Sequence, residues 1–328
     1  MEPPASAPVA VAVPQPPAGL ACWSYDRFAL PLPTQHRYPR GRFLAVRERA
    51  LAGGLLRRAQ IRLAEPAPWP LLERVHAPEY LRAVREGTLS AQAVRELGLP
   101  FSPELVLRAR AAVGAACAAA EHALAAGVAC VIGGGTHHAF ADRAAGYCLF
   151  NDLAVAIRVL QQRHAVHRVA IVDLDVHQGN GSAEIFQHDA GVFTFSVHGE
   201  RNWPYRKSTG DLDLGLPDGT EDAAYLAALE PRLREVLDGF RPDLVCYLAG
   251  ADPLHNDRLG RLRLTHDGLR TRDRRVLEAC RERGIPVVVT LGGGYAVPLD
   301  DTVTVHLNTL RELQALFGSA RRLRAEDP

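Results

Sequence analysis

The chain has 328 residues, of which 47% are hydrophobic and 23% are charged, so it is long enough for one large α/β domain or two ordinary ones. Its 38 lysine and arginine residues nearly balance its 37 aspartate and glutamate residues, giving a net charge of +1. This balance argues against direct nucleic-acid binding, and no apolar run approaches the roughly 20 residues of a membrane span.

Residues 1–19 are rich in proline and alanine, and they lack the basic start and continuous apolar segment of a signal peptide. We expect a disordered leader there and a single domain over residues 20–328. The six cysteines form no Cys-x-x-Cys pair and several lie inside apolar runs, which indicates buried thiols in a reducing compartment rather than disulfides. The expected location is therefore the cytoplasm.

The first third of the chain carries weak signals for regular structure. Residues 23–70 read as mostly irregular, apart from a predicted helix over residues 42–58. Residues 103–127 are dominated by alanine, leucine and arginine at helical spacing, with a proline near the first turn, and they predict a long helix.

From residue 128 onward, short β-branched runs alternate with helical stretches. The predicted strands cover residues 128–132, 169–172, 192–197, 244–248 and 287–291. The predicted helices cover residues 152–162, 222–240 and 265–283. Continuous apolar strands that alternate with helices predict a parallel sheet covered on both faces.

Polar and glycine-rich residues follow each predicted strand. In chain order these segments are Gly133-Gly134-Gly135-Thr136-His137-His138, Asp173-Leu174-Asp175-Val176-His177, His198-Gly199, Ala249-Gly250-Ala251-Asp252 and Gly292-Gly293-Gly294-Tyr295. Ligands bind at the carboxyl ends of the strands in open parallel sheets. We therefore expect these distant segments to converge on one crevice.

Three of these residues form a candidate metal site. Asp175 and His177 are two positions apart, so in an extended segment their side chains point to the same side, and Asp252 supplies a third donor. Such a set leaves coordination positions for water and a substrate carbonyl, as a catalytic zinc requires; Fe(II) or Mn(II) would also fit. The side chains of an isolated Asp-x-His segment more often face solvent than bind a metal, so the interpretation as a metal site depends on the other motifs.

The adjacent pair His137-His138 is a candidate acid/base pair beside that metal. Asp173 is placed to orient and charge-stabilise one histidine, and Asn180 to hold the other. A carboxylate raises the pKa of a histidine whereas an amide cannot do so by charge, so the pair would contain one imidazolium and one neutral base near pH 7. The alternative for two histidines alone is a solvent-exposed loop pair.

Tyr295 follows three glycines that permit a close approach of the backbone. Its hydroxyl is a candidate donor to the oxyanion that forms when water attacks a carbonyl. Without the other motifs, a core tyrosine at a strand end would be the better interpretation.

Together these segments resemble the histone deacetylase family, and specifically its class IV-like branch with bacterial relatives. The matching segments also include His76-Ala77-Pro78-Glu79-Tyr80-Leu81, Gly146-Tyr147-Cys148-Leu149-Phe150-Asn151-Asp152 and Gln178-Gly179-Asn180-Gly181. The resemblance implies an arginase/deacetylase-like three-layer α/β fold whose central, mostly parallel sheet has about eight strands, with residues 20–328 as one catalytic domain. Many relatives carry an aspartate at the position of Asn180. The second histidine and its partner at this position therefore differ in charge from the corresponding pair in those relatives.

The resemblance also implies roles for individual residues. Asp175, His177 and Asp252 match the zinc ligands, His138 the usual proton shuttle, His137 its charged neighbour and Tyr295 the tyrosine that polarises the scissile carbonyl. The matches for the acyl-lysine tunnel and substrate contacts are Gly146, Tyr147, Gly293 and, from the loop 198–207, Trp203 or Tyr205. The family's structural K⁺ would involve Asp173, Asp175, His177, Ser196 and Val197.

The activity implied is zinc-dependent removal of an acetyl or longer acyl group from lysine side chains of a protein or peptide. Three alternatives stay open: a deacetylase of acetylpolyamines or other small N-acyl amines, a catalytically silent acyl-lysine-binding module, and a two-manganese ureohydrolase of the same fold. The last needs a second carboxylate shortly after Asp252, and Pro253-Leu254-His255 does not supply one. The oligomeric state is not predicted.

Overall fold

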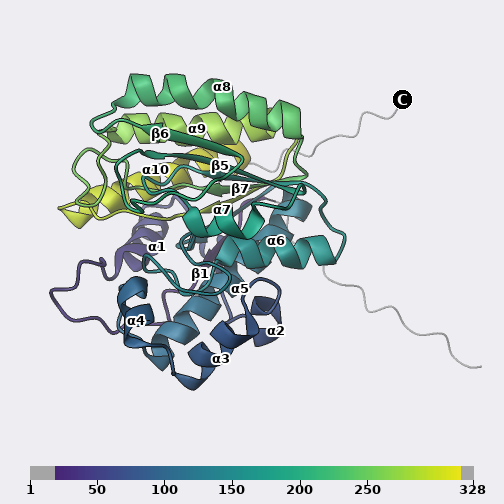
Figure 1. Ribbon diagram of the computed structural model, residues 1–328. Coiled ribbons are helices and arrows are strands. Elements are labelled where there is room, and N and C mark those ends of the chain that lie inside the picture. The colour runs from purple at the N-terminus through teal and green to yellow at the C-terminus, as the bar shows by residue number, and fades with distance from the viewer. Residues whose placement is uncertain (1–18, 319–328) are drawn as a thin grey trace, which may run out of the picture.

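A computed structural model describes residues 19–318, in which helices cover both faces of one eight-stranded sheet (Figure 1). The strands are β1 (Cys22–Ser24), β2 (Ile61–Leu63), β3 (Val128–Ile132), β4 (Val169–Asp173), β5 (Val192–Gly199), β6 (Leu212–Leu216), β7 (Leu244–Leu248) and β8 (Val287–Thr290). Their order is β2-β1-β3-β8-β7-β4-β5-β6, and every neighbouring pair is parallel. The prediction of a mostly parallel sheet of about eight strands is confirmed. The proposed leader lies outside the described residues except for Gly19.

The helices form the two outer layers. They are α1 (Arg42–Ala52), α2 (Trp69–Leu72), α3 (Pro78–Glu86), α4 (Ala91–Leu97), α5 (Pro103–Ala126), α6 (Asp152–Gln162), α7 (Asn180–Phe186), α8 (Asp222–Phe240), α9 (His266–Glu282) and α10 (Leu299–Phe317), with a 3-10 turn at Arg58–Gln60. In Figure 1, α8, α9 and α10 lie on one face of the sheet, and α5 and α6 lie on the other.

Two hydrophobic cores follow from the alternation of side chains along the strands. In β3, Ala129 and Val131 pack into the core shared with α5 and α6, whereas Val128, Cys130 and Ile132 pack into the core shared with α1, α8, α9 and α10. All five residues are buried because helices cover both faces. This double burial is why the sequence shows a continuous apolar run instead of an alternating one.

The structure differs from the sequence-based expectation at the edges of the sheet. Residues 23–70 were expected to be mostly irregular but contain β2, and β1 overlaps their start; both strands are only three residues long and show no readable period. The helix expected over residues 42–58 ends at Ala52, where Gly53 and Gly54 follow. The edge strand β6 was also missed, because its residues are alternately half-buried and exposed.

The strand order places the candidate residues together. In the sheet, β3, β8, β7 and β4 are consecutive neighbours. His137 follows β3, Tyr295 follows β8, Asp252 follows β7 and Asp175 follows β4. Because parallel strands end at the same edge, four segments spread over about half of the chain meet at one place.

Two further expectations concern the described residues. Within residues 19–318, no helix is both long and apolar enough to cross a membrane. All six cysteines are buried and free, as their positions in apolar runs indicated.

Candidate active site

Three buried side chains form a cluster with the spacing of metal ligands. Donor atoms of Asp175, His177 and Asp252 all lie within 4.8 Å of one another. His177 Nδ1 is 2.9 Å from Asp175 Oδ1 and 3.3 Å from Asp252 Oδ2. Ligands about 2.0–2.2 Å from one tetrahedral zinc ion are separated by similar distances, so the cluster fits such an ion.

An unpaired oxygen also supports a cation at this cluster. Asp252 Oδ2 is buried and has no hydrogen-bond partner within the part of the chain that the structure describes. Leaving a buried carboxylate oxygen unpaired is costly, and a cation bound between Asp252 and Asp175 would compensate it. The structure thus brings together all three predicted ligands in an arrangement that can hold a divalent ion.

Hydrogen bonds fix the loops that carry these ligands. The Val176 N–H donates to Asp252 Oδ1 at 2.9 Å, so one carboxylate oxygen is tied to the backbone while the other stays available. Beneath the loops, the buried guanidinium of Arg272 donates to the carbonyl oxygens of Leu174 at 3.0 Å and Gly250 at 2.7 Å. Each acceptor lies next to or near a ligand, so this arginine links the two ligand segments.

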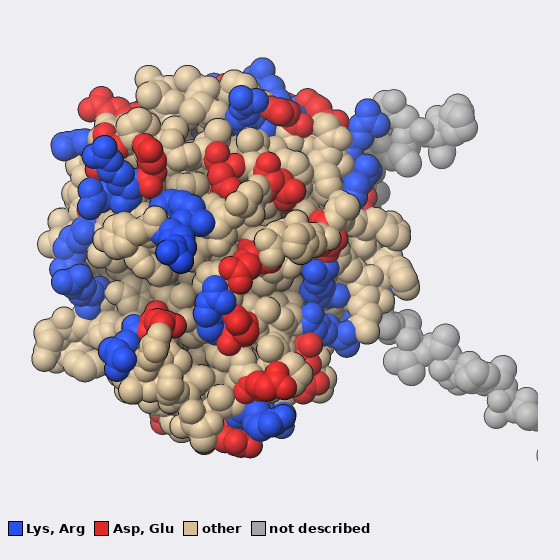
Figure 2. Space-filling view, viewed as in Figure 1, with Lys and Arg blue, Asp and Glu red and all other residues tan. Residues whose placement is uncertain are grey.

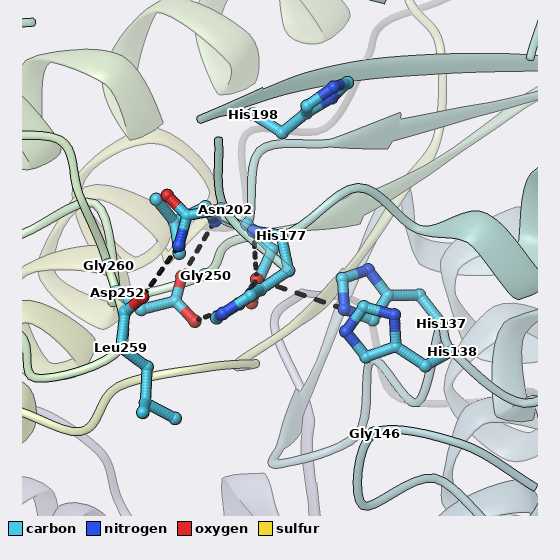
Figure 3. Close-up of polar contacts among 12 residues, drawn as sticks. His137, His138, Gly146, His177, His198, Asn202, Gly250, Asp252, Leu259 and Gly260 are labelled. Atoms are coloured by element: carbon cyan, nitrogen blue, oxygen red, sulfur yellow. Dashed lines mark hydrogen bonds and ion pairs between the residues drawn. The ribbon is translucent and has the colours of Figure 1, made fainter. Parts of the chain in front are cut away.

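The two adjacent histidines stand beside each other, opposite His177 (Figure 3). Their ring centroids are 4.0 Å apart. His137 Nδ1 lies 2.6 Å from Asp173 Oδ2, and its Nε2 lies 3.9 Å from Asp175 Oδ1. His138 Nδ1 lies 2.8 Å from Asn180 Oδ1. Each histidine therefore has the partner that the sequence suggested.

The different hydrogen-bond partners shift the pKa values of the two histidines in opposite directions. Burial alone would lower the pKa of His137, but the negative charge of Asp173 and the hydrogen bond to it outweigh burial and raise that pKa to about 9. Burial and the charges of His137 and His177 lower the pKa of His138 well below its usual value, and the Asn180 amide offsets this only weakly. The two histidines of the pair thus have pKa values shifted in opposite directions, which favours the charged form of His137 and the neutral form of His138.

Tyr295 is buried on the wall of the same cavity. Its backbone N–H donates to Asp257, and Arg42 lies over its ring at 5.3 Å from the centroid. Burial raises the pKa of the Tyr295 hydroxyl well above its usual value, so the hydroxyl keeps its proton and can donate it to a carbonyl oxygen.

The cavity connects these groups to the surface. It has a volume of about 890 Å³ and is lined by the metal cluster, both histidines and Tyr295. On one wall, Gly146 has φ 51°, and a Cβ there would come within 2.6 Å of both His138 and Trp203. Gly146 therefore sets the width of the passage beside the neutral histidine.

Aromatic side chains that the sequence analysis offered as candidates for the tunnel wall line the cavity. Trp203 lies against His138, with ring centroids 4.6 Å apart, and Tyr147 faces Tyr295 at 6.1 Å. Tyr205, the other candidate from the same loop, is 82% exposed and lies at the mouth. Gly293 (φ 59°) lies at the floor, where a Cβ would come within 2.6 Å of Asp175 and Asp252 carboxylate oxygens.

Comparison with known proteins decides the family. The family model described as "Histone deacetylase domain" matches residues 36–310. The chain belongs to the histone deacetylase family. A histone deacetylase-like amidohydrolase of Pseudomonas aeruginosa is 34% identical over 74% of this chain and 68% of its own length. An uncharacterized protein of Picosynechococcus is 45% identical over 85% of this chain and 93% of its own length.

Solved structures agree with this assignment. A crystal structure of an HDAC homologue from Aquifex aeolicus has a TM-score of 0.78 and 25% sequence identity, and it covers 90% of this chain and 84% of its own. An HDAC homologue complexed with SAHA has a TM-score of 0.79 at 26% identity, with the same two coverages. This deacetylase-family chain therefore has the expected arginase/deacetylase-like fold and is a hydrolase that acts on amides.

Of the five residues that the resemblance implies for a structural K⁺, Asp175 and His177 belong to the metal cluster itself, and Asp173, Ser196 and Val197 lie on β4 and β5. Asp173 and Ser196 are register partners on the neighbouring strands β4 and β5, and Val197 follows Ser196. Asp173 Oδ1 also accepts the Asp175 N–H at 3.1 Å, while Ser196 Oγ lies 2.9 Å from His198 Nδ1. Asp173 thus contacts His137 through one carboxylate oxygen and the backbone N–H of Asp175 through the other.

Two buried residues of this deacetylase's site were missed from the sequence. Asp257 accepts the backbone N–H groups of Leu259 at 2.8 Å and Gly260 at 2.9 Å as well as that of Tyr295. Arg42 donates to the Gly294 carbonyl at 2.6 Å. Neither belongs to a strand-end motif, and burial of a lone charged residue leaves no signal in a sequence.

Proposed function

We propose that this chain is a zinc-dependent deacylase that removes an acetyl or longer acyl group from the side-chain amine of lysine. The supporting observation is the convergence of the three-residue metal cluster, two oppositely tuned histidines and Tyr295 on one cavity. When bound, the divalent ion would polarise the amide carbonyl and acidify a water molecule.

The two histidines would divide the proton transfers. Because His138 Nδ1 donates to Asn180, its Nε2 has a free lone pair, and the lowered pKa keeps this ring neutral. His138 would therefore accept the proton of the attacking water and pass it to the leaving amine. His137 would remain an imidazolium beside Asp173 and stabilise developing negative charge.

Tyr295 would bind the substrate oxygen. Its protonated hydroxyl would donate to the carbonyl and more strongly to the oxyanion that follows attack by water. Gly146, Tyr147 and Trp203 would enclose the acyl-lysine stem, whose apolar methylene groups suit this aromatic passage.

We also propose K⁺ as a structural ion near Asp173, Asp175, His177, Ser196 and Val197. A cation there would offset the negative charge of Asp173 and support the turn that carries Asp175. It takes no part in the reaction that we propose.

The experiment compares metal-free protein with protein reloaded with Zn²⁺, Fe²⁺ or Mn²⁺. We expect hydrolysis of an acetyl-lysine peptide to return with about one Zn²⁺ ion per chain and to disappear again with a chelator. Two manganese ions per chain would instead support a ureohydrolase. Tight peptide binding without cleavage under every metal condition would show a silent binding module and overturn the proposal.

A further inference from the structure

The mouth of the active-site cavity carries an unusual excess of arginine. Besides the buried Arg42, the lining residues include six arginines and, near the surface, a single glutamate, Glu96. The lining arginines are Arg37, Arg95, Arg143, Arg206, Arg258 and Arg261. Since the whole chain has a net charge of only +1, this imbalance is local. Basic and acidic groups are interspersed over the face that Figure 2 presents.

Four of these arginines have no acidic partner among the described residues. Arg143 pairs with Asp142 and Glu184, and Arg261 pairs with Asp218. Arg37, Arg95, Arg206 and Arg258 form no ion pair within residues 19–318, and all four are exposed. Their positive charges are therefore free to act on an approaching substrate.

The four arginines surround the mouth because they come from four separate segments. Arg37 lies in the loop before α1, Arg95 on α4, Arg206 in the loop after β5 and Arg258 in the loop after Asp252. Like charges on low-dielectric walls around a cleft focus the electric field there and raise the local concentration of oppositely charged ligands. The acidic floor does not cancel this field, since a divalent ion would offset Asp175 and Asp252.

A side hollow brings two of the arginines close to the reacting groups. A cavity of about 290 Å³ is lined by Arg37, Arg258, Leu259 and Tyr295. Arg258 Nε lies 3.4 Å from the Tyr295 carbonyl oxygen. A carboxylate placed between Arg37 and Arg258 would thus sit near the tyrosine that we propose binds the scissile carbonyl, and guanidinium groups bind carboxylates well.

We propose that this enzyme selects N-acyl amines that carry negative charge beside the acylated nitrogen, and that it discriminates against polycations such as acetylpolyamines and lysine-rich tails. This inference rests on the proposed deacylase function. The shared chemistry is one or more carboxylates within reach of the arginine rim. They would come either from aspartate or glutamate flanking an acyl-lysine or from a small dianionic amide.

The test compares matched acetyl-lysine peptides whose flanking residues are aspartate, serine or arginine. At low ionic strength we expect kcat/KM for the acidic peptide to exceed that of the neutral peptide about 10-fold, and the basic peptide to be about 10-fold worse than neutral. Both ratios should shrink at high salt, because salt screens exposed charges. Nα-succinyl-Nε-acetyl-lysine and monoacetylspermidine extend the comparison to small anionic and cationic substrates.

Charge reversal identifies the rim as the cause. In Arg37→Glu/Arg206→Glu, the ratio of acidic to neutral kcat/KM should fall below one, and the basic peptide should become the better substrate. Arg58→Glu/Arg234→Glu provides the matched control, since both arginines are exposed and neither lines the cavity. An unchanged ratio in the double variant, or a wild-type preference for the basic peptide, would overturn the inference.

A binding measurement separates this inference from the proposed function. Calorimetric titration of the zinc-loaded Tyr295→Phe variant with the three peptides ranks their affinities without requiring turnover. If no peptide is hydrolysed by the parent but the acidic peptide binds tightest, the deacylase proposal fails and the charge selection stands. If the neutral peptide is hydrolysed and binds as tightly as the acidic one, the charge selection fails alone.

Discussion

The floor and the rim of the active site are built in different ways. At the floor, Asp175 and Asp252 are almost fully buried and lie directly beyond the ends of the central strands β4 and β7. At the rim, Tyr205 and Arg206 are exposed on a long loop. The sheet therefore positions the candidate catalytic groups, while the loops form the opening through which a substrate would enter.

The largest expected effect tests the metal cluster. In Asp252→Asn, Oδ1 can still accept the Val176 N–H, but the oxygen that would bind the ion becomes an NH₂ group. Since loss of an indirect, outer-shell contact costs about 10–100-fold in metal affinity, loss of a direct ligand should cost more than about 100-fold and abolish turnover. Metal analysis after dialysis measures this.

Asp257→Asn is the matched control for that variant. It makes the same chemical change five residues away, at a carboxylate that binds backbone N–H groups rather than the ion, so its metal content should stay at the level of the parent. Equal metal retention in both variants would show that Asp252 is not a ligand.

A smaller effect is expected when only the oxyanion donor is removed. Tyr295→Phe should lower kcat about 100-fold, because removal of one preorganised donor costs about 10²–10³ in other hydrolases. Metal content should be unchanged, which separates this role from that of Asp252. Steady-state kinetics on a neutral acetyl-lysine peptide measures it, and a variant as active as the parent would refute the assigned role of Tyr295.

The smallest effect is a shift along the pH axis. In Asn180→Asp, a carboxylate replaces the amide beside His138, and its negative charge should raise the pKa of that histidine. His138 accepts a proton only when neutral, and the parent keeps it neutral to low pH because its pKa is well below the usual value. The acid limb of kcat/KM should therefore move to higher pH, so the variant loses activity at pH 6 relative to pH 8. An unmoved profile at equal metal content would exclude His138 as the base.

Much of the floor was predictable from the sequence. Strands such as β3 and β7 are buried on both faces and therefore appear in the sequence as uninterrupted apolar runs. The polar residues that follow each strand identify the edge of the sheet where ligands bind. The motifs also indicated Asp173 and Asn180 as partners of the two histidines, and the resemblance implied that His137 is the charged one; the structure places His137 against Asp173 and His138 against Asn180.

The rim and the supporting contacts were not predictable in the same way. The free arginines at the mouth lie in loops or on the short helix α4, and only the fold shows that they face one opening. Asp257 and Arg42 are polar residues whose burial depends on packing between distant segments. The short strands β1 and β2 contribute too few residues for a period to be read.

The position of the candidate ligands just beyond the ends of β4 and β7 has a consequence for how the protein folds. These strands are neighbours in the sheet but are separated along the chain by α7, β5, β6 and α8. No local hairpin or helical fragment can therefore assemble the cluster, and its formation must wait for a long-range pairing of the kind that slows folding. Uptake of the ion during refolding would consequently report when these two strands have docked in the middle of the sheet.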